Sequence, residues 1–226
     1  MKRYILVSNK EWQINVLKKT LQLKEVGWYF ISKPADFTEE KVREINPKKI
    51  FITHWSNKIL PAIYESFDCI LFHMTDLPFG RGGSPLQNLI VRGETETKIS
   101  AIKVVEELDA GDIYLKKNLK LDGTAREIFL NATDVMAEMI EELIETNLKP
   151  KVQTGEVVVF KRRKPEDSNI EKLDDLKQVY DYIRMLDGEG YPNAYLETEH
   201  LKFEFVNANN NNAENVINAY VRITKK

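Results

Sequence analysis

The sequence has very little cysteine and histidine, which limits the chemistry it can carry. Cys69 is the only cysteine among 226 residues, so no intramolecular disulfide can form. It lies within an apolar run, which is typical of a small buried side chain rather than a reactive thiol. The three histidines are His54, His73 and His200. None has an i, i+4 partner or a nearby cysteine, so we expect no metal site.

Long apolar stretches are also missing from the sequence. No run approaches the roughly 18 apolar residues that a membrane-spanning helix needs. The N-terminal stretch MKRYILVSNKEW contains too short an apolar run for a signal peptide. The expectation is a cytoplasmic protein with no membrane partner.

The chain has no surplus of either charge. It contains 33 Lys and Arg against 35 Asp and Glu, a formal net charge of −2. Nucleic-acid-binding proteins usually have a basic surplus, because contacts to phosphates dominate their affinity. One local basic cluster, KRRK at 161–164, is more typical of a solvated strand edge. We therefore expect no nucleic-acid partner.

Several standard catalytic motifs are not found. The sequence has no Walker motif and no G-x-S-x-G nucleophile elbow. The GRGG stretch at 80–83 lacks the full dinucleotide-binding spacing and follows the fourth expected strand instead of the first. A classical nucleotide cofactor is therefore a weak interpretation.

Short apolar runs alternate with helical patterns through the first part of the chain. The strand runs are continuous rather than alternating in polarity, which is typical of parallel strands covered on both faces. This order predicts an α/β fold with a mainly parallel sheet flanked by helices. The expected strands are 3–8, 28–32, 49–54 and 69–73. The expected helices are 11–25, 36–47 and 58–67. Gly27 is the expected stop of the first helix, and Thr38 is the expected cap of the second.

The next segments carry strong helix-boundary signals. The sequence predicts a helix over 84–93, with Ser84 and Gln87 as a capping box and Gly93 as the stop. Strands are expected over 98–105 and 113–121. A long helix over 124–148 would begin with a second capping box, Thr124 and Glu127, and carries an apolar stripe at helical spacing.

The pattern changes beyond Pro150. We expect a strand, an amphipathic helix, a hairpin, a flexible polar loop and a last strand. This divides the chain into a larger domain, 1–150, and a small α+β subdomain, 151–226. The strand is expected at 156–163, the helix at 169–188, the hairpin at 194–208, the loop at 207–215 and the last strand at 218–223.

Two polar loops follow expected strands and are the best candidates for chemistry. One begins at His73 and reads HMTDLPFGRGGS; the other reads EELDAGD and contains Asp109. A histidine oriented by a carboxylate can act as a general acid or base. The alternative is a core histidine with satisfied hydrogen bonds and aspartates that cap turns. Spacing alone favours this alternative.

The residues also match a known pattern. CILFHMTDLPFGRGGSPLQ, followed by LDAGD 36 residues after His73, resembles the folate-dependent formyltransferases. VFKRRKPEDSNI and IRMLDGEGYPNAYL resemble C-terminal motifs of the same superfamily. The resemblance implies a Rossmann-like formyltransferase domain with a small C-terminal subdomain. It also implies transfer of a formyl group from 10-formyltetrahydrofolate to an amine, with His73 and Asp109 as the catalytic residues. This domain would be 1–150.

One position departs from the family pattern. The family has an asparagine two residues before the histidine, where this chain has Leu71. A leucine cannot donate a hydrogen bond to a developing oxyanion. Asn88 and Thr75 are the candidates for a replacement donor, and Asn88 is the one we assign to catalysis.

The resemblance further implies which residues contact the two substrates. The acceptor is expected near Ser8, Asn9, Lys10 and Thr75. The residues expected to bind the formyl donor are Pro78, Arg81, Gly82, Ser84, Leu108 and Asp112.

The nature of the amine is the least constrained expectation. The near-neutral charge and the small C-terminal subdomain favour a nucleotide-linked amino sugar in surface glycan biosynthesis. The alternatives are a methionyl-tRNA or peptide-synthetase-type formyltransferase, or a folate-binding module that has lost catalysis. A homodimer is left open.

Overall fold

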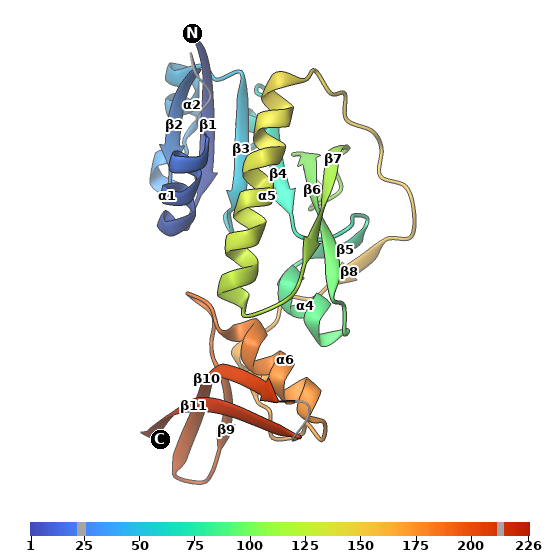
Figure 1. Ribbon diagram of the computed structural model, residues 1–226. Helices are drawn as coiled ribbons and strands as arrows, with labels where there is room; N and C mark the ends of the chain where they lie inside the picture. The colour runs from blue at the N-terminus through green and yellow to red at the C-terminus, as the bar shows by residue number, and fades with distance from the viewer. Residues whose placement is uncertain (22–25, 212–214) are drawn as a thin grey trace. The chain divides into compact units, whose positions relative to one another are not determined.

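The computed structural model describes residues 1–21, 26–211 and 215–226, which form two compact units. Unit 1 holds 1–82, 97–119 and 130–159, and unit 2 holds 83–96, 120–129 and 160–226. Figure 1 shows the elements of both units along the chain. The boundary expected after Pro150 falls inside unit 1. The functional assignment of residues 1–150 stays a prediction.

Unit 1 is built on a six-stranded sheet with the order β2-β1-β3-β4-β6-β7. The pairs β1–β2, β1–β3 and β3–β4 are parallel, whereas β4 and β6 are antiparallel. The α/β fold with a mainly parallel sheet is therefore confirmed. The strands are β1 (Lys2–Ser8), β2 (Val26–Ile31), β3 (Lys49–His54), β4 (Cys69–His73), β6 (Glu96–Lys103) and β7 (Ile113–Lys120).

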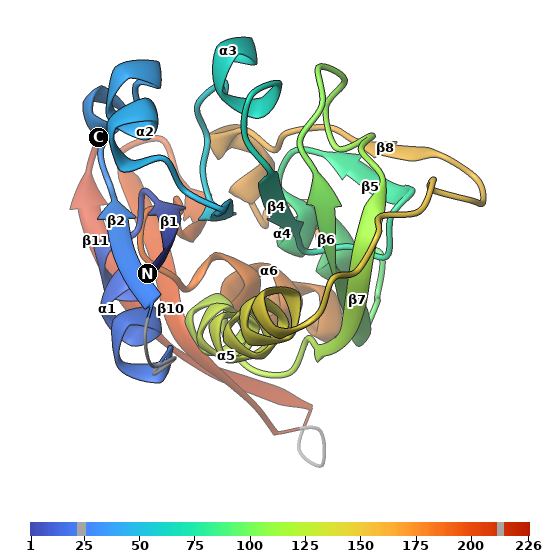
Figure 2. The same cartoon turned by 90° about the horizontal axis from the view of Figure 1, so that it is seen from above.

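Helices cover both faces of this sheet. Figure 2 shows α1 and α5 on one face and α2 and α3 on the other. The α2/α3 side buries a core that includes Ile5, Ile50, Val42 and Ile63. Burial on both faces explains why the strands are continuously apolar. The helices are α1 (Glu11–Thr20), α2 (Glu39–Ile45), α3 (Pro61–Tyr64) and α5 (Ala125–Glu145), with a 3-10 turn η1 (Pro34–Asp36).

The predicted cap of α2 is confirmed, whereas the predicted end of α1 is wrong. Thr38 caps α2 by accepting a hydrogen bond from the Lys41 amide. α1 ends at Thr20, and residues 22–25 of its expected span lie outside the described residues. Gly27 is not a helix stop; it lies inside β2, paired with Arg3.

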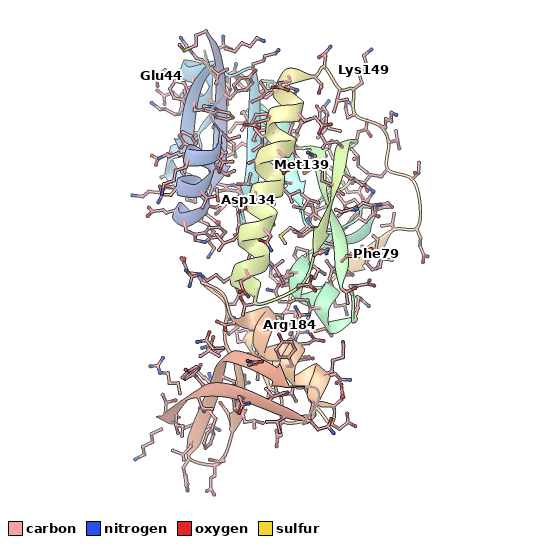
Figure 3. The ribbon with its side chains drawn as sticks, viewed as in Figure 1. Glu44, Phe79, Asp134, Met139, Lys149 and Arg184 are labelled. Carbon is pink, nitrogen blue, oxygen red and sulfur yellow. The ribbon has the colours of Figure 1, made fainter. Side chains whose placement is uncertain are left out.

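A short strand absent from our sequence expectations follows β4. β5 (Phe79–Gly82) pairs with β8 (Val158–Phe160), which the sequence did predict within 156–163. Phe79, labelled in Figure 3, marks the start of β5. An apolar run predicts a strand far better than Phe-Gly-Arg-Gly does.

The capping box predicted at the start of the next helix is wrong. α4 (Pro85–Val91) does begin after Ser84, but the Ser84 side chain does not cap it. The Ser84 hydroxyl accepts a hydrogen bond from the Arg163 amide, and the Gln87 amide donates to the Met185 carbonyl. Hydrogen bonds to residues distant in the sequence therefore take the place of the local capping bonds.

The second capping box is confirmed. The Thr124 amide donates to the Glu127 carboxylate at 2.8 Å, and the Glu127 amide donates to the Thr124 hydroxyl at 3.3 Å. These bonds hold the Glu127 pKa below its usual range. α5 runs from there to Glu145, close to its expected span.

The rest of unit 2 is a three-stranded antiparallel sheet against α6. The sheet order is β11-β10-β9, and Asp175 caps α6 through the Gln178 amide. The predicted flexible loop at 207–215 is wrong for 207–211, which belong to β10; residues 212–214 lie outside the described residues. The remaining elements are η2 (Pro165–Ser168), α6 (Leu176–Leu186), β9 (Ala194–Glu197), β10 (Leu201–Asn211) and β11 (Val216–Lys225).

Arg184, labelled in Figure 3, anchors α6 within unit 2. Its guanidinium pairs with Asp181 at 2.7 Å, and both residues are buried. It also donates to the carbonyls of Leu121 and Gly123 at 2.6 and 2.9 Å. Losing one partner of such a buried ion pair is costly, because the other charge is left uncompensated.

None of the helices in the described part of the chain is long and apolar enough to cross a membrane.

Candidate active site

His73 and Asp109 face each other at the end of β4. Nδ1 of His73 lies 3.7 Å from Oδ1 of Asp109, and the two side chains are 8% and 7% exposed. This is the contact that the sequence expectation required. The distance is longer than a hydrogen bond, so the two groups are adjacent but not directly bonded.

Asp109 reaches this position by an indirect route. Because β6 runs antiparallel to β4, the loop after β6 begins beside Cys69, at the opposite end of β4 from His73. The Val104 amide donates to the Cys69 carbonyl there. The loop must therefore fold back along the sheet for Asp109 to meet His73.

Three consecutive residues of β5 hold the pair. The Gly80 carbonyl lies 2.8 Å from Nε2 of His73, and the Gly82 amide donates to Oδ2 of Asp109 at 2.9 Å. Arg81, between them, binds side chains of the neighbouring segments. Gly82 has a φ of 102°, a conformation that only glycine adopts readily. Two glycines of β5 thus contact the side chains of His73 and Asp109 directly.

The Gly80 contact fixes the protonation pattern of the imidazole. A carbonyl oxygen can only accept, so Nε2 of His73 carries a proton and donates it. In the neutral ring, Nδ1 is then the basic nitrogen, and it faces Asp109. Nδ1 is therefore the ring nitrogen that can accept a proton.

The loop that carries Asp109 is tightly constrained. Asp109 itself has a φ of 53°, in the left-handed region that non-glycine residues rarely adopt. Gly111 packs so closely on β6 that an added Cβ would lie 1.7 Å from the Lys103 carbonyl oxygen. Strained backbone of this kind is held only where the surroundings over-determine it.

Gln153 is a site-adjacent residue that sequence reasoning missed. Its side chain donates to the carbonyls of Asp109 and Gly111, both at 2.8 Å. Arg81 donates to its carbonyl oxygen at 2.8 and 3.2 Å and pairs with Glu107 at 3.0 Å. No local pattern marks Gln153, because it belongs to a segment without regular structure between α5 and β8.

Leu71 occupies the position where the family pattern has asparagine. It lies opposite Ile52 in the parallel β3–β4 pair and packs against the apolar core on the α2/α3 side. It points to the same face as His73, because alternate residues of a strand share a face. A polar side chain at 71 would therefore be directed toward the site.

Asn88 is committed to backbone contacts within unit 2. Its side-chain nitrogen donates to the carbonyls of Gly83, Ser84 and Lys161 at 2.9 to 3.0 Å. An amide nitrogen has only two hydrogens, so no donor is left for a reacting oxyanion in this arrangement. A catalytic role for Asn88 stays a prediction that needs these bonds to break.

The residues expected to bind the formyl donor differ in their exposure and in the hydrogen bonds they already make. Leu108 is 70% exposed next to the buried Asp109, so it offers an apolar contact surface. Pro78 is buried, and its carbonyl accepts from the Val158 amide. Asp112 is half-buried, and its carbonyl accepts from the Lys103 amide. The groups of Arg81, Gly82 and Ser84 described above are engaged within the protein.

Two of the residues expected to touch the acceptor are fully buried. Ser8 and Thr75 have no exposed surface. The Ser8 hydroxyl donates to Gln13, and the Thr75 hydroxyl donates to the Gly80 carbonyl. Neither hydroxyl is exposed in this conformation, so a contact of either residue with an acceptor stays a prediction.

Asn9 and Lys10 remain at the exit of β1. This is the point where the strand order reverses, since β2 and β3 lie on opposite sides of β1. In the described part of the chain, Oδ1 of Asn9 and Nε1 of Trp55 are buried without hydrogen-bond partners. Burial, with the positive charge of Lys10, lowers the pKa of the adjacent His54 to about 4. Open α/β sheets commonly bind ligands at such a reversal point.

No group of three or more metal-ligating side chains lies together within residues 1–21, 26–211 and 215–226.

Comparison with known proteins gives a consistent result. A solved structure of methionyl-tRNA formyltransferase from Clostridium thermocellum is 46% identical, with a TM-score of 0.96, and the match covers 100% of both chains. The family described as methionyl-tRNA formyltransferase, C-terminal domain, matches residues 165–224.

More distant matches also cover most of the chain. A 4-N formyltransferase from Francisella tularensis is 14% identical, with a TM-score of 0.67, over 88% of this chain and 93% of that one. A methionyl-tRNA formyltransferase from Clostridium botulinum is 28% identical over 166 residues, covering 70% of this chain. The match spans 53% of that curated relative, about half its length.

Proposed function

Because this chain belongs to the formyltransferase superfamily, we propose that it transfers a formyl group from 10-formyltetrahydrofolate to a primary amine. The observation that carries this proposal is the distance of 3.7 Å between the side chains of His73 and Asp109. The loop that carries Asp109 has to fold back along the sheet to bring them together. A purely structural histidine would not need a strained aspartate brought to its free ring nitrogen.

His73 acts in this proposal through Nδ1. The amine must be neutral to attack the formyl carbon, and Nδ1 accepts the proton that the new C–N bond releases. The same proton then passes to the folate nitrogen as its bond to the formyl carbon breaks. Asp109 stabilises the imidazolium that exists between these two steps.

Tetrahydrofolate binding is supported by the exposed surface beside the pair. Leu108 is a large apolar side chain that stands in solvent next to a buried carboxylate. A fused aromatic ring system would cover it favourably, since apolar contact provides most of the affinity of small-molecule sites. Pro78 and Asp112 are assigned to the donor as well, whereas Arg81, Gly82 and Ser84 act through the protein framework.

The acceptor is assigned to the β1 exit. Lys10 provides a positive charge for a phosphate, and the unpartnered Oδ1 of Asn9 can accept from an amine or hydroxyl. Both lie at the same edge of the parallel strands as His73, because β1, β3 and β4 run in the same direction. The amine would enter from this side.

Methionyl-tRNA is the acceptor that the comparisons favour. The Clostridium thermocellum protein of that name is far more similar to this chain than the Francisella tularensis 4-N formyltransferase is. The basic side chains of Lys161, Arg162 and Lys164 are exposed, as contacts to phosphates require. This proposal replaces the amino sugar, which the charge and the small C-terminal subdomain favoured, and the expected absence of a nucleic-acid partner.

A nucleotide-linked amino sugar stays a second candidate on one observation. The net charge is −2, and transfer RNA binding usually relies on a basic surplus. The two acceptors share the requirement for a neutral amine beside His73, so the active site does not separate them.

The test supplies purified protein with 10-formyltetrahydrofolate and each acceptor in turn. Release of tetrahydrofolate together with a 28-dalton gain on methionyl-tRNA, one formyl group in place of a hydrogen, supports the leading proposal. Formylation of an amino sugar alone supports the second candidate. No formylation of any amine, although tetrahydrofolate binds, would contradict the proposal and favour a non-catalytic folate-binding protein.

A further inference from the structure

The segment between α5 and β8 contacts the loop that carries Asp109. Figure 1 shows it crossing from the end of α5, past β7, to β8 beside β5. Lys151 bridges to Ile113 at the start of β7 through two backbone hydrogen bonds of 2.7 and 2.9 Å. Further on, the Val158 amide donates to the Pro78 carbonyl. The segment is therefore attached on both sides of the Asp109 loop, and Gln153 lies between the two attachments.

Gln153 connects the loop to β5 with its whole amide group. Both hydrogens of Nε2 are used, one for the Asp109 carbonyl and one for the Gly111 carbonyl, and Oε1 accepts twice from Arg81. Carbonyls only accept and a guanidinium only donates, so the amide can take one orientation only. A glutamate could accept from Arg81 but could not donate to the two loop carbonyls.

These contacts support a stretch of backbone in an unfavourable conformation. Asp109 is in the left-handed region, and the structure gives its carboxylate one backbone hydrogen bond, from Gly82. The distance from His73 is set by where the loop backbone lies, because that carboxylate does not bond the imidazole directly. Gln153 binds this backbone through two carbonyls, and Gly111 of the same loop packs closely on Lys103 of β6.

We propose that Gln153 is a positioning residue, which keeps the carboxylate of Asp109 in register with Nδ1 of His73. This inference rests on the proposed formyl transfer, because positioning matters only if the pair is catalytic. Gln153 contacts the loop backbone and Arg81, so it acts on the reaction through Asp109.

Kinetics of three variants test this role. Gln153→Ala removes all four hydrogen bonds, and Gln153→Glu keeps the contact to Arg81 but loses both donors to the loop. We expect kcat to fall by about 10- to 100-fold in each, the effect of a misplacement of about 1 Å, with KM for the donor within threefold of wild type. Thr154→Ala, a change at the exposed next residue, is the matched control and should leave kcat unchanged.

A double-mutant cycle separates positioning from a general structural effect. If Gln153 acts through the Asp109 carboxylate, Gln153→Ala should cost nothing further in an Asp109→Asn background. A kcat within twofold of wild type for Gln153→Ala, or a full additive loss in the double variant, would overturn the proposal.

Backbone amide exchange provides a readout independent of activity. In the donor-free protein, Gln153→Ala should speed exchange in residues 107–112 while leaving β1 and β3 unchanged. Unchanged exchange in 107–112 contradicts the inference about Gln153. A wild-type protein that formylates no amine contradicts the proposed function instead, so the two failures are distinguishable.

Discussion

Nδ1 of His73 lies 3.7 Å from Oδ1 of Asp109, although the chain approaches Asp109 from the far end of the strand that His73 terminates. This relationship depends on β5, whose Gly80 carbonyl and Gly82 amide bind the two side chains. One short strand therefore sets both the proton position on the imidazole and the direction of the carboxylate.

Leu71→Asn should raise kcat and lower stability. The new amide would share a face with His73 and offer the hydrogen bond that a developing oxyanion needs; one such donor contributes about 10²- to 10³-fold in other enzymes. Stability should fall by about 1–3 kcal/mol, because a polar group replaces an apolar one that packs on the core. The measurement is kcat together with urea unfolding.

Leu71→Ala is the control for the Leu71→Asn variant. It removes similar packing without adding a donor, so it should lose stability and gain no activity. Equal kcat for the asparagine and alanine variants would contradict this explanation of position 71.

His54 should make the protein sensitive to mild acid. Burial, then the charge of Lys10, lowers its folded-state pKa to about 4, below the ordinary value of 6.5. Between these two values the unfolded chain binds the proton and the folded chain does not. Stability is therefore full above pH 6.5 and falls toward pH 4, by at most about 3 kcal/mol.

The pH effect is measured by comparing variants. His54→Gln should flatten the unfolding free energy between pH 6.5 and pH 4 relative to wild type. His200→Gln, at a histidine whose side chain is 77% exposed, should leave the profile unchanged. Parallel profiles for His54→Gln and wild type would show that His54 does not carry the acid sensitivity.

Cys69 should be inert in the folded protein. Burial, with a contribution from the charge of Asp68, raises the pKa of its thiol to about 12, so almost no reactive thiolate exists at pH 8. Iodoacetamide should modify the native protein at least about 10³-fold more slowly than the urea-unfolded chain. Rapid modification of native protein would contradict the burial of this side chain.

The Arg184 contacts should dominate the local stability of unit 2. Arg184→Met leaves the carbonyls of Leu121 and Gly123 without their donor and Asp181 without its buried partner. We expect a loss of about 3 kcal/mol in unfolding free energy. Lys177→Met removes the exposed partner of the same aspartate and should cost less than about 1 kcal/mol. Equal losses in the two variants would refute the assignment.

The sequence predicted the elements whose signal is carried by their own residues. The continuous apolar strands 49–54 and 69–73 match β3 and β4, because burial on both faces leaves a direct pattern. Thr38 and Thr124 cap their helices as expected, since those hydrogen bonds are local.

Features set by distant partners were not predictable in this way. Ser84 has the residue type of a cap, but the Arg163 amide, 79 positions away, takes its hydroxyl. Gln153 binds a loop 44 residues earlier from a segment with no pattern. His73 and Asp109 were identified through the family resemblance; their spacing alone favoured an ordinary core histidine.

The most direct test of the account is the rate of formyl transfer from 10-formyltetrahydrofolate after changes at the two facing residues. His73→Ala and Asp109→Asn should each lower kcat by about 10²- to 10⁴-fold, with the folded state preserved by circular dichroism. The double variant should be no slower than the worse single variant, because the two groups act as a unit. Turnover by either single variant within threefold of wild type would contradict the claim that this pair performs the reaction.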